Sequence, residues 1–141
     1  MSTGDRVPFE TTLRVRDSCL CLHVQRAARA LARRFDEALR PLGITSGQYS
    51  LLMSMNRPEP ATMSQVAALL AMDRTTLTAA LKPLERRGLA VVAIDPADRR
   101  SRRLTLLAAA VPVWERTHAA VEGLMTGVPA DSFRDALREL S

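Results

Sequence analysis

The chain has 141 residues, of which 47% are hydrophobic and 25% are charged, and its net charge is +5. This length suits one domain, 1–141, with a hydrophobic core, and the composition argues against a disordered chain. The first residues lack the apolar core of a signal peptide, and no apolar run approaches the roughly 18 to 20 residues that span a bilayer. We therefore expect a cytoplasmic protein without membrane contact.

The positive charge is concentrated in residues 74–103, which carry eight basic and three acidic side chains. Within this segment, the sequence DPADRRSRR at 95–103 places four arginines among five consecutive residues. Such an asymmetry is typical of a protein that binds a polyanion, nucleic acid above all. A solvated surface loop is the alternative explanation for an arginine cluster taken alone.

In chain order, the first predicted element is a long amphipathic helix over residues 16–40, because apolar side chains recur there at intervals of three and four. Three shorter helices are predicted to follow, at about 45–56, 63–70 and 74–87. The first two begin with the Thr-x-x-Gln pattern of a capping box, formed by Thr45 with Gln48 and by Thr62 with Gln65. Asp73 can act as the N-cap of the third, and Gly88 ends it.

Two strand-like segments, at 89–94 and about 102–107, flank an Asp-Pro turn and predict a β-hairpin. An amphipathic helix is predicted from residue 109, and in a short final helix Ser132 and Asp135 have the spacing of an N-terminal cap. The predicted fold class is therefore mainly α with a small β-hairpin.

The order of these elements points to nucleic acid. A short helix, a tight turn and a second helix form a helix-turn-helix, whose second helix lies in the DNA major groove, and the hairpin that follows is a wing. We predict a winged helix-turn-helix lobe over 45–107. The residues expected to contact DNA from its helices and wing are Ser64, Gln65, Arg74, Thr75, Thr76, Thr78, Lys82, Asp98, Arg99, Arg100 and Arg102.

A rigid hairpin explains the arginine cluster physically. Its tip can reach the narrow minor groove beside the occupied major groove, where the negative potential is strongest over A·T-rich sequence. We expect Asp98 to pair with a neighbouring arginine and to fix its direction.

The run MDRTTLTAALKPLERRGLAVVAIDPADRR resembles the signature of the MarR family of winged-helix transcriptional regulators, and the match is close from about 62 to 103. The resemblance implies a homodimer whose N- and C-terminal helices, at 12–42 and 109–141, interlock, and whose two lobes bind a pseudo-palindromic operator in double-stranded DNA. It also implies that Asp98 orients Arg100 for the minor groove. A dimer is expected on physical grounds too, because one recognition helix reads too few base pairs. Taken alone, the apolar stripes of the terminal helices fit an intramolecular core equally well.

The sequence CLCLH at residues 19–23 suggests a switch. On one continuous helix Cys19 and His23 share a face, while Cys21 points elsewhere. A thiol near a helix N-terminus can react as the thiolate, although a buried and inert cysteine is the commoner case. Two ligands on one face are too few for zinc, so we expect neither a metal nor a cofactor.

The MarR resemblance places Cys21 where the organic-hydroperoxide sensors of the family carry their reactive cysteine. Those sensors surround it with tyrosines, whereas the matching positions here are Phe35 and Ser46, and Tyr49 is the only tyrosine. The candidate effector residues are Cys21, Cys19, His23 and Tyr49. The other effector that the family commonly uses is a small aromatic or phenolic ligand between the dimer helices and the lobe.

The function predicted is that of a repressor released by one of these effectors. A thiol-dependent, peroxide-reactive enzyme and a winged-helix module that binds protein are the alternatives. The chain has no glycine-rich phosphate loop, no dense Cys/His array and no nucleophile motif, so we do not expect an enzyme.

Overall fold

The computed structural model describes residues 4, 6–124, 126–127 and 130–140. The chain divides into two compact units, Met1–Arg34 and Phe35–Ser141. Among the described residues, none of the helices combines the length and the apolar character that crossing a membrane requires.

The first unit contains α1 (Phe9–Ser18) and most of α2 (Leu20–Leu39). The prediction of one uninterrupted helix over 16–40 is therefore wrong in two respects, since helix begins earlier and breaks at Cys19. Cys19 is extended, with ψ of 104°, and its N–H donates to the Val15 carbonyl at the end of α1. Its sulfur accepts from the N–H of Leu22 at 3.5 Å, so the residue that ends α1 also caps the first turn of α2.

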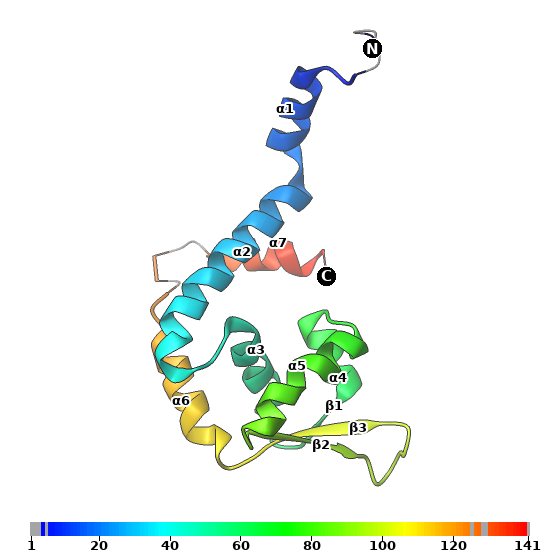
Figure 1. Cartoon of the computed structure of the whole chain (residues 1–141), viewed down its shortest axis with the longest axis vertical. Coiled ribbons are helices and arrows are strands. Elements are labelled where there is room, and N and C mark those ends of the chain that lie inside the picture. Colours follow the sequence, from blue (N-terminus) through cyan, green and yellow to red (C-terminus); the bar gives the residue numbers. More distant parts are fainter. Residues whose placement is uncertain (1–3, 5, 125, 128–129, 141) are drawn as a thin grey trace. The chain divides into compact units, whose positions relative to one another are not determined.

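The second unit opens with the end of α2 and the 3₁₀ turn η1 (Arg40–Leu42). The remaining elements follow in the order α3 (Ser46–Met55), β1 (Ala61–Thr62), α4 (Met63–Leu70), α5 (Arg74–Arg86), β2 (Ala90–Ile94), β3 (Arg102–Leu106), α6 (Ala110–Val121) and α7 (Ala130–Arg138). The mainly helical class and the hairpin are confirmed, and Figure 1 shows α3, α4 and α5 on one side of the strands.

Local capping explains where three of these helices begin. Both capping boxes are present: in each, the threonine oxygen accepts from the glutamine N–H, and the glutamine side chain accepts from the threonine N–H. Asp73 caps α5 as predicted. The predicted cap at Ser132 is not formed, because α7 already begins at Ala130 and Asp135 pairs with Arg138.

The sheet has three strands in the order β1-β3-β2, all antiparallel, so the predicted hairpin carries an additional two-residue strand. In the register of the sheet, Thr62 faces Arg103 and Val92 faces Leu104. The core lies between this sheet and the helices. Its fully buried leucines come from α2, α3, α5 and β3 and are Leu39, Leu52, Leu77, Leu81, Leu84 and Leu104.

Candidate nucleic-acid interface

Helix α5 has two contrasting faces. Leu77, Leu81 and Leu84 recur every three or four residues and are 0% exposed, because they pack into the core. The exposed face carries the predicted contact residues, which are Arg74, Thr75, Thr76, Thr78 and Lys82. The helix is thus held by one side while a basic and hydroxylated side faces solvent.

The N-terminus of α5 is capped by side-chain hydrogen bonds. Asp73 accepts from the N–H of Thr76 at 2.8 Å and from its hydroxyl at 2.7 Å, and these two bonds lower the pKa of Asp73. The Thr78 hydroxyl donates to the Arg74 carbonyl at 2.7 Å. Because both threonine hydroxyl hydrogens are used inside the helix, Thr76 and Thr78 offer a partner acceptor oxygens and methyl groups.

The start of α4 presents Ser64 and Gln65, both exposed. The Gln65 side-chain oxygen already accepts from the Thr62 N–H at 3.0 Å and from Arg57 Nη1 at 3.2 Å. The group of Gln65 that suits a phosphate or a base edge is therefore its amide NH₂, which is a donor.

The base of the wing turn is stabilised by Asp95, whose side chain is only 8% exposed. It accepts from the Ala97 N–H at 2.9 Å, and Arg103 Nε lies 3.0 Å from its other oxygen. The Ala97 bond, followed by the Arg103 guanidinium, lowers the pKa of Asp95. From the sequence alone, Asp95 had no assigned role, and Arg103 counted only as one of the four arginines of the wing.

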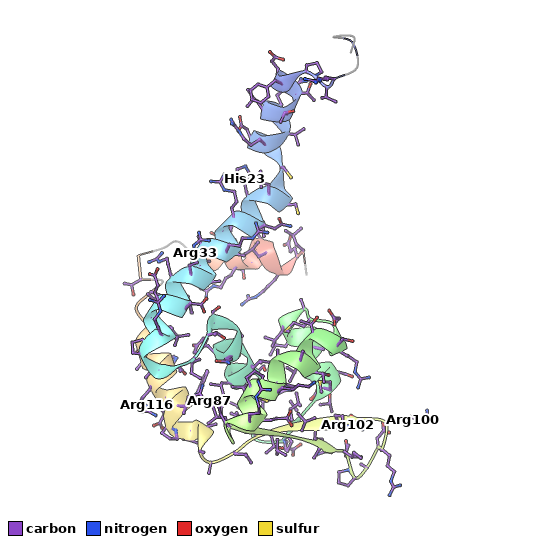
Figure 2. The ribbon with its side chains drawn as sticks, in the orientation of Figure 1. His23, Arg33, Arg87, Arg100, Arg102 and Arg116 are labelled. Carbon is purple, nitrogen blue, oxygen red and sulfur yellow. The ribbon has the colours of Figure 1, made fainter. Side chains whose placement is uncertain are left out.

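Asp98 behaves differently from the prediction. Its carboxylate accepts from the main-chain N–H of Arg100 at 3.0 Å, so it shapes the turn and does not pair with an arginine side chain. Arg99 and Arg100 are exposed, and Arg100 lies at the far end of the hairpin (Figure 2). Arg102 is half-buried, and its Nη1 donates to the carbonyls of Arg99 and Ser101 at 3.3 and 3.4 Å. Two of the four wing arginines thus extend into solvent, while Arg102 and Arg103 brace the turn.

The thiol candidates lie in the first unit. Cys21 is exposed, and its sulfur accepts from Gln25 Nε2 at 3.4 Å, whereas Cys19 is half-buried. The His23 ring bonds to the Asp17 carbonyl at 3.2 Å. Cys19 is extended and lies outside α2, so the two residues do not lie on the one continuous helix that the predicted shared face requires. Among the described residues, no cluster of three or more His, Cys, Asp or Glu side chains could hold a metal ion.

Tyr49 belongs to the second unit and sits in an aromatic stack. Its ring lies 5.4 Å from Trp114 and 6.1 Å from Phe35, and Trp114 in turn stacks on His118. Burial raises the pKa of Tyr49. Because Cys21 and Tyr49 belong to different units, a shared sensor site stays a prediction.

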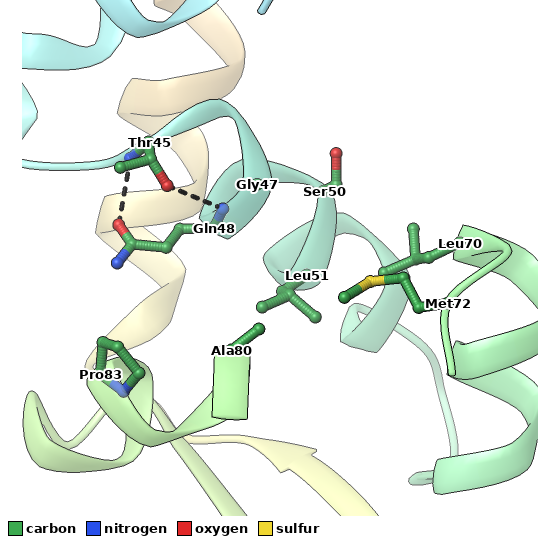
Figure 3. Close-up of a pocket in the computed structure, with 9 residues that line it drawn as sticks. All are labelled: Thr45, Gly47, Gln48, Ser50, Leu51, Leu70, Met72, Ala80 and Pro83. Carbon is green, nitrogen blue, oxygen red and sulfur yellow. Dashed lines mark hydrogen bonds between the residues drawn. The ribbon is translucent and has the colours of Figure 1, made fainter. Parts of the chain in front are cut away.

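A pocket of about 390 Å³ opens between α3, the turn before α5, and α5 itself. Figure 3 shows Leu51, Ala80, Leu70 and Met72 around it, with the Thr45–Gln48 capping box at its edge. The lining residues are Thr45, Gly47, Gln48, Ser50, Leu51, Leu70, Met72, Ala80 and Pro83. A mostly apolar wall with a few hydroxyl and amide groups suits a small apolar ligand.

Comparison with known proteins identifies this arrangement. A model of the MarR family matches residues 42–101. The crystal structure of the Mycobacterium tuberculosis transcriptional regulator MosR in complex with DNA has a TM-score of 0.77 and is 34% identical, over 87% of this chain and 93% of that one. The chain belongs to the MarR family of transcriptional regulators.

Two further relatives fit this MarR assignment. The transcriptional repressor CouR, solved bound to a 23-mer DNA duplex, has a TM-score of 0.73 and 27% identity over 89% of this chain and 92% of that chain. The transcriptional activatory protein BadR of Rhodopseudomonas palustris is 30% identical over 68% of this chain, and the chain spans 57% of the length of BadR. The segment that matches the MarR model contains the helix-turn-helix, β2 and the hairpin turn, whereas α1, α6 and α7 lie outside it.

Proposed function

We propose that this MarR-family protein is a cytoplasmic homodimer that binds a pseudo-palindromic operator in double-stranded DNA and is released by an effector. One observation carries the proposal: a helix with a fully buried leucine face presents a basic, hydroxylated face next to a wing with two exposed arginines. A surface of this kind matches a major groove and the adjacent minor groove. MosR and CouR, each more than 25% identical, were solved on DNA.

In the dimer we propose, the helices within 12–42 and 109–141 form the interface. The predicted residues of α4, α5 and the wing contact DNA, with Asp98 acting through the main chain of Arg100. Repression is the mode we favour because a bound dimer excludes other proteins from its site. An operator upstream of a promoter would give activation instead, the mode named in BadR.

The proposal is tested by binding to a labelled duplex from directly upstream of the protein's own gene, over a series of salt concentrations. Six to ten phosphate contacts predict a loss of affinity of about 10³- to 10⁵-fold between about 50 and 200 mM salt. A flat response would exclude the phosphate-contact interface and favour the protein-binding module.

The effector is proposed to act at Cys21 by oxidation, or as a small aromatic molecule. The pocket in Figure 3 is our candidate for the second mode; it lies within the lobe, whereas the predicted ligand site lay between the dimer helices and the lobe. DNA binding by reduced and hydroperoxide-treated protein separates these two modes. Loss of binding that a thiol reductant reverses, and that Cys21→Ser abolishes while Cys19→Ser does not, supports oxidation. Steady consumption of peroxide would instead identify the thiol-dependent enzyme. Binding that responds only to an added phenol or benzoate, and no longer responds in Ala80→Met, supports the pocket.

A further inference from the structure

The corner between α2 and α3 is anchored on both sides. Leu39 at the end of α2 and Ile44 before α3 are both buried, and Gly43 between them has a left-handed φ of 65°. On the side of α3, the carboxylate of Asp36 accepts from the Ser46 N–H at 2.6 Å. The corner is therefore a defined turn with little freedom of its own.

Arg87 ties this corner to the recognition helix. Its Nη1 donates to the Gly43 carbonyl at 2.8 Å, across 44 residues of sequence. A side chain at position 43 would begin 4.0 Å from Nη2 of the same guanidinium, so the guanidinium lies close over the glycine. Through this bond, the C-terminal end of α5 is attached to the backbone of the corner.

The backbone around Arg87 is itself fixed. Its N–H donates to the Pro83 carbonyl at 3.1 Å, and the following Gly88, with φ of 68°, donates to the Glu85 carbonyl at 3.0 Å. Leu89 then donates to the Leu84 carbonyl at 3.0 Å. A well-capped helix end thus carries the guanidinium, so its bond to Gly43 constrains the whole helix.

Resting on the proposed function, we infer that Arg87 is a positioning residue for DNA binding. It holds the end of α5 against the corner through which α5 is connected to α2. In a dimer that binds through the N-terminal helices, this corner determines how the two recognition helices are oriented on half-sites one helical turn apart. Arg87 lies within the basic segment 74–103, and one donor of its guanidinium already binds the Gly43 carbonyl.

The test uses a duplex selected from a random pool by the wild-type protein, together with copies in which one base pair is added or removed between the half-sites. Arg87→Ala is expected to bind the selected duplex roughly tenfold more weakly. The slope of log K against log salt should stay at the wild-type value, since no phosphate contact is lost. The preference for the selected spacing over the shifted spacings should shrink.

Three further variants control the experiment. Arg87→Lys retains one donor for Gly43 and should recover most of the affinity and spacing preference. Arg87→Met keeps the aliphatic stem without donors, and carries the test if the alanine variant does not fold by circular dichroism. Arg86→Ala removes the neighbouring exposed arginine and should leave spacing preference unchanged.

Two results would overturn the inference: an unchanged affinity in Arg87→Ala and Arg87→Met, or a salt slope that falls by about 0.9 for each arginine removed, which is the mark of a lost phosphate contact. If the wild-type protein selects no duplex, the proposed function fails instead.

Discussion

Asp95 and Asp98, three residues apart in the wing, have different structural roles. Asp95 is buried, accepts from the Ala97 N–H and is paired with Arg103, while the exposed Asp98 accepts from the Arg100 N–H. The first carboxylate holds the two strands together at the base of the turn, and the second shapes the tip. The two carboxylates therefore have separate roles, one between the strands and one in the turn.

The paired Asp95 makes the stability of the wing depend on pH. Since its pKa is lowered below the ordinary value of 3.8, its contribution is present above pH 3.8 and is lost as the pH falls through the folded-state pKa. We expect Asp95→Asn to lower the Tm at pH 7 and the difference from wild type to shrink as the pH falls below 3.8. Thermal unfolding followed by circular dichroism at a series of pH values measures this, with Asp98→Asn as the exposed control. An equal Tm at pH 7 would mean that the ion pair contributes no stability.

Loss of the Arg100 side chain should weaken DNA binding without changing stability. It is exposed at the tip of the hairpin, so Arg100→Ala is expected to change the free energy of unfolding by less than about 0.5 kcal/mol. Operator affinity should fall, and the salt slope should drop by about 0.9, the change expected when one phosphate contact is lost. Fluorescence anisotropy over a salt series measures both quantities. Arg116→Ala on α6 is the matched control, and a wing variant indistinguishable from it would exclude a minor-groove contact.

At the scale of an element, α5 separates folding from recognition along its two faces. Leu81→Ala is expected to destabilise the protein by about 2 to 5 kcal/mol, since a fully buried leucine leaves a cavity. Thr75→Ala, on the exposed face, should leave the stability close to wild type and weaken operator binding. Urea unfolding and DNA titration of both variants test this division. A Thr75 variant with normal binding would show that the groove surface lies elsewhere.

The elements that could be predicted from sequence are those whose ends depend on local chemistry. Thr45 with Gln48, Thr62 with Gln65, and Asp73 each satisfy helix N–H groups within three residues, so a short stretch of sequence contains the whole interaction. The hairpin was predictable for the same reason, because its strands are joined by a turn with a strong sequence pattern.

The elements that could not be predicted depend on distant partners or interrupt an unbroken pattern. β1 has only two residues, and it exists because it pairs with β3 some forty residues later. The break at Cys19 lies within a continuous run of apolar spacing, so periodicity gave no sign of it. In the candidate site the exposed face of α5 followed from periodicity, whereas the roles of Arg103 and Arg87 follow from tertiary contacts.

At the scale of the whole molecule, several large apolar side chains of the described residues are exposed. Phe9, Leu20, Phe133 and Leu140 are 51 to 68% exposed, and they lie on or beside helices that we propose to form the dimer interface. Large apolar side chains exposed to water commonly mark an interface.

We therefore expect the protein to sediment as a dimer, and Phe133→Asp to shift it toward monomer because it places a charge in that interface. The monomer should bind a two-half-site duplex at least 100-fold more weakly, since it reads only one half-site. Analytical ultracentrifugation and anisotropy measure the two effects, with the exposed Asp131→Asn as a control on the same helix. A monomeric wild-type protein that binds tightly would contradict the expectation.

Thr62 is part of the sheet and also the N-cap of α4. Its backbone pairs with Arg103 in the sheet, and its side chain begins α4, the first helix of the helix-turn-helix. The strand that pairs with the wing and the cap that begins α4 therefore share one residue, and we expect loss of one to weaken the other. The two parts should open together as one cooperative unit, with similar protection of their amide hydrogens against exchange. If the two parts open together, the proposed major-groove and minor-groove contacts would be lost together.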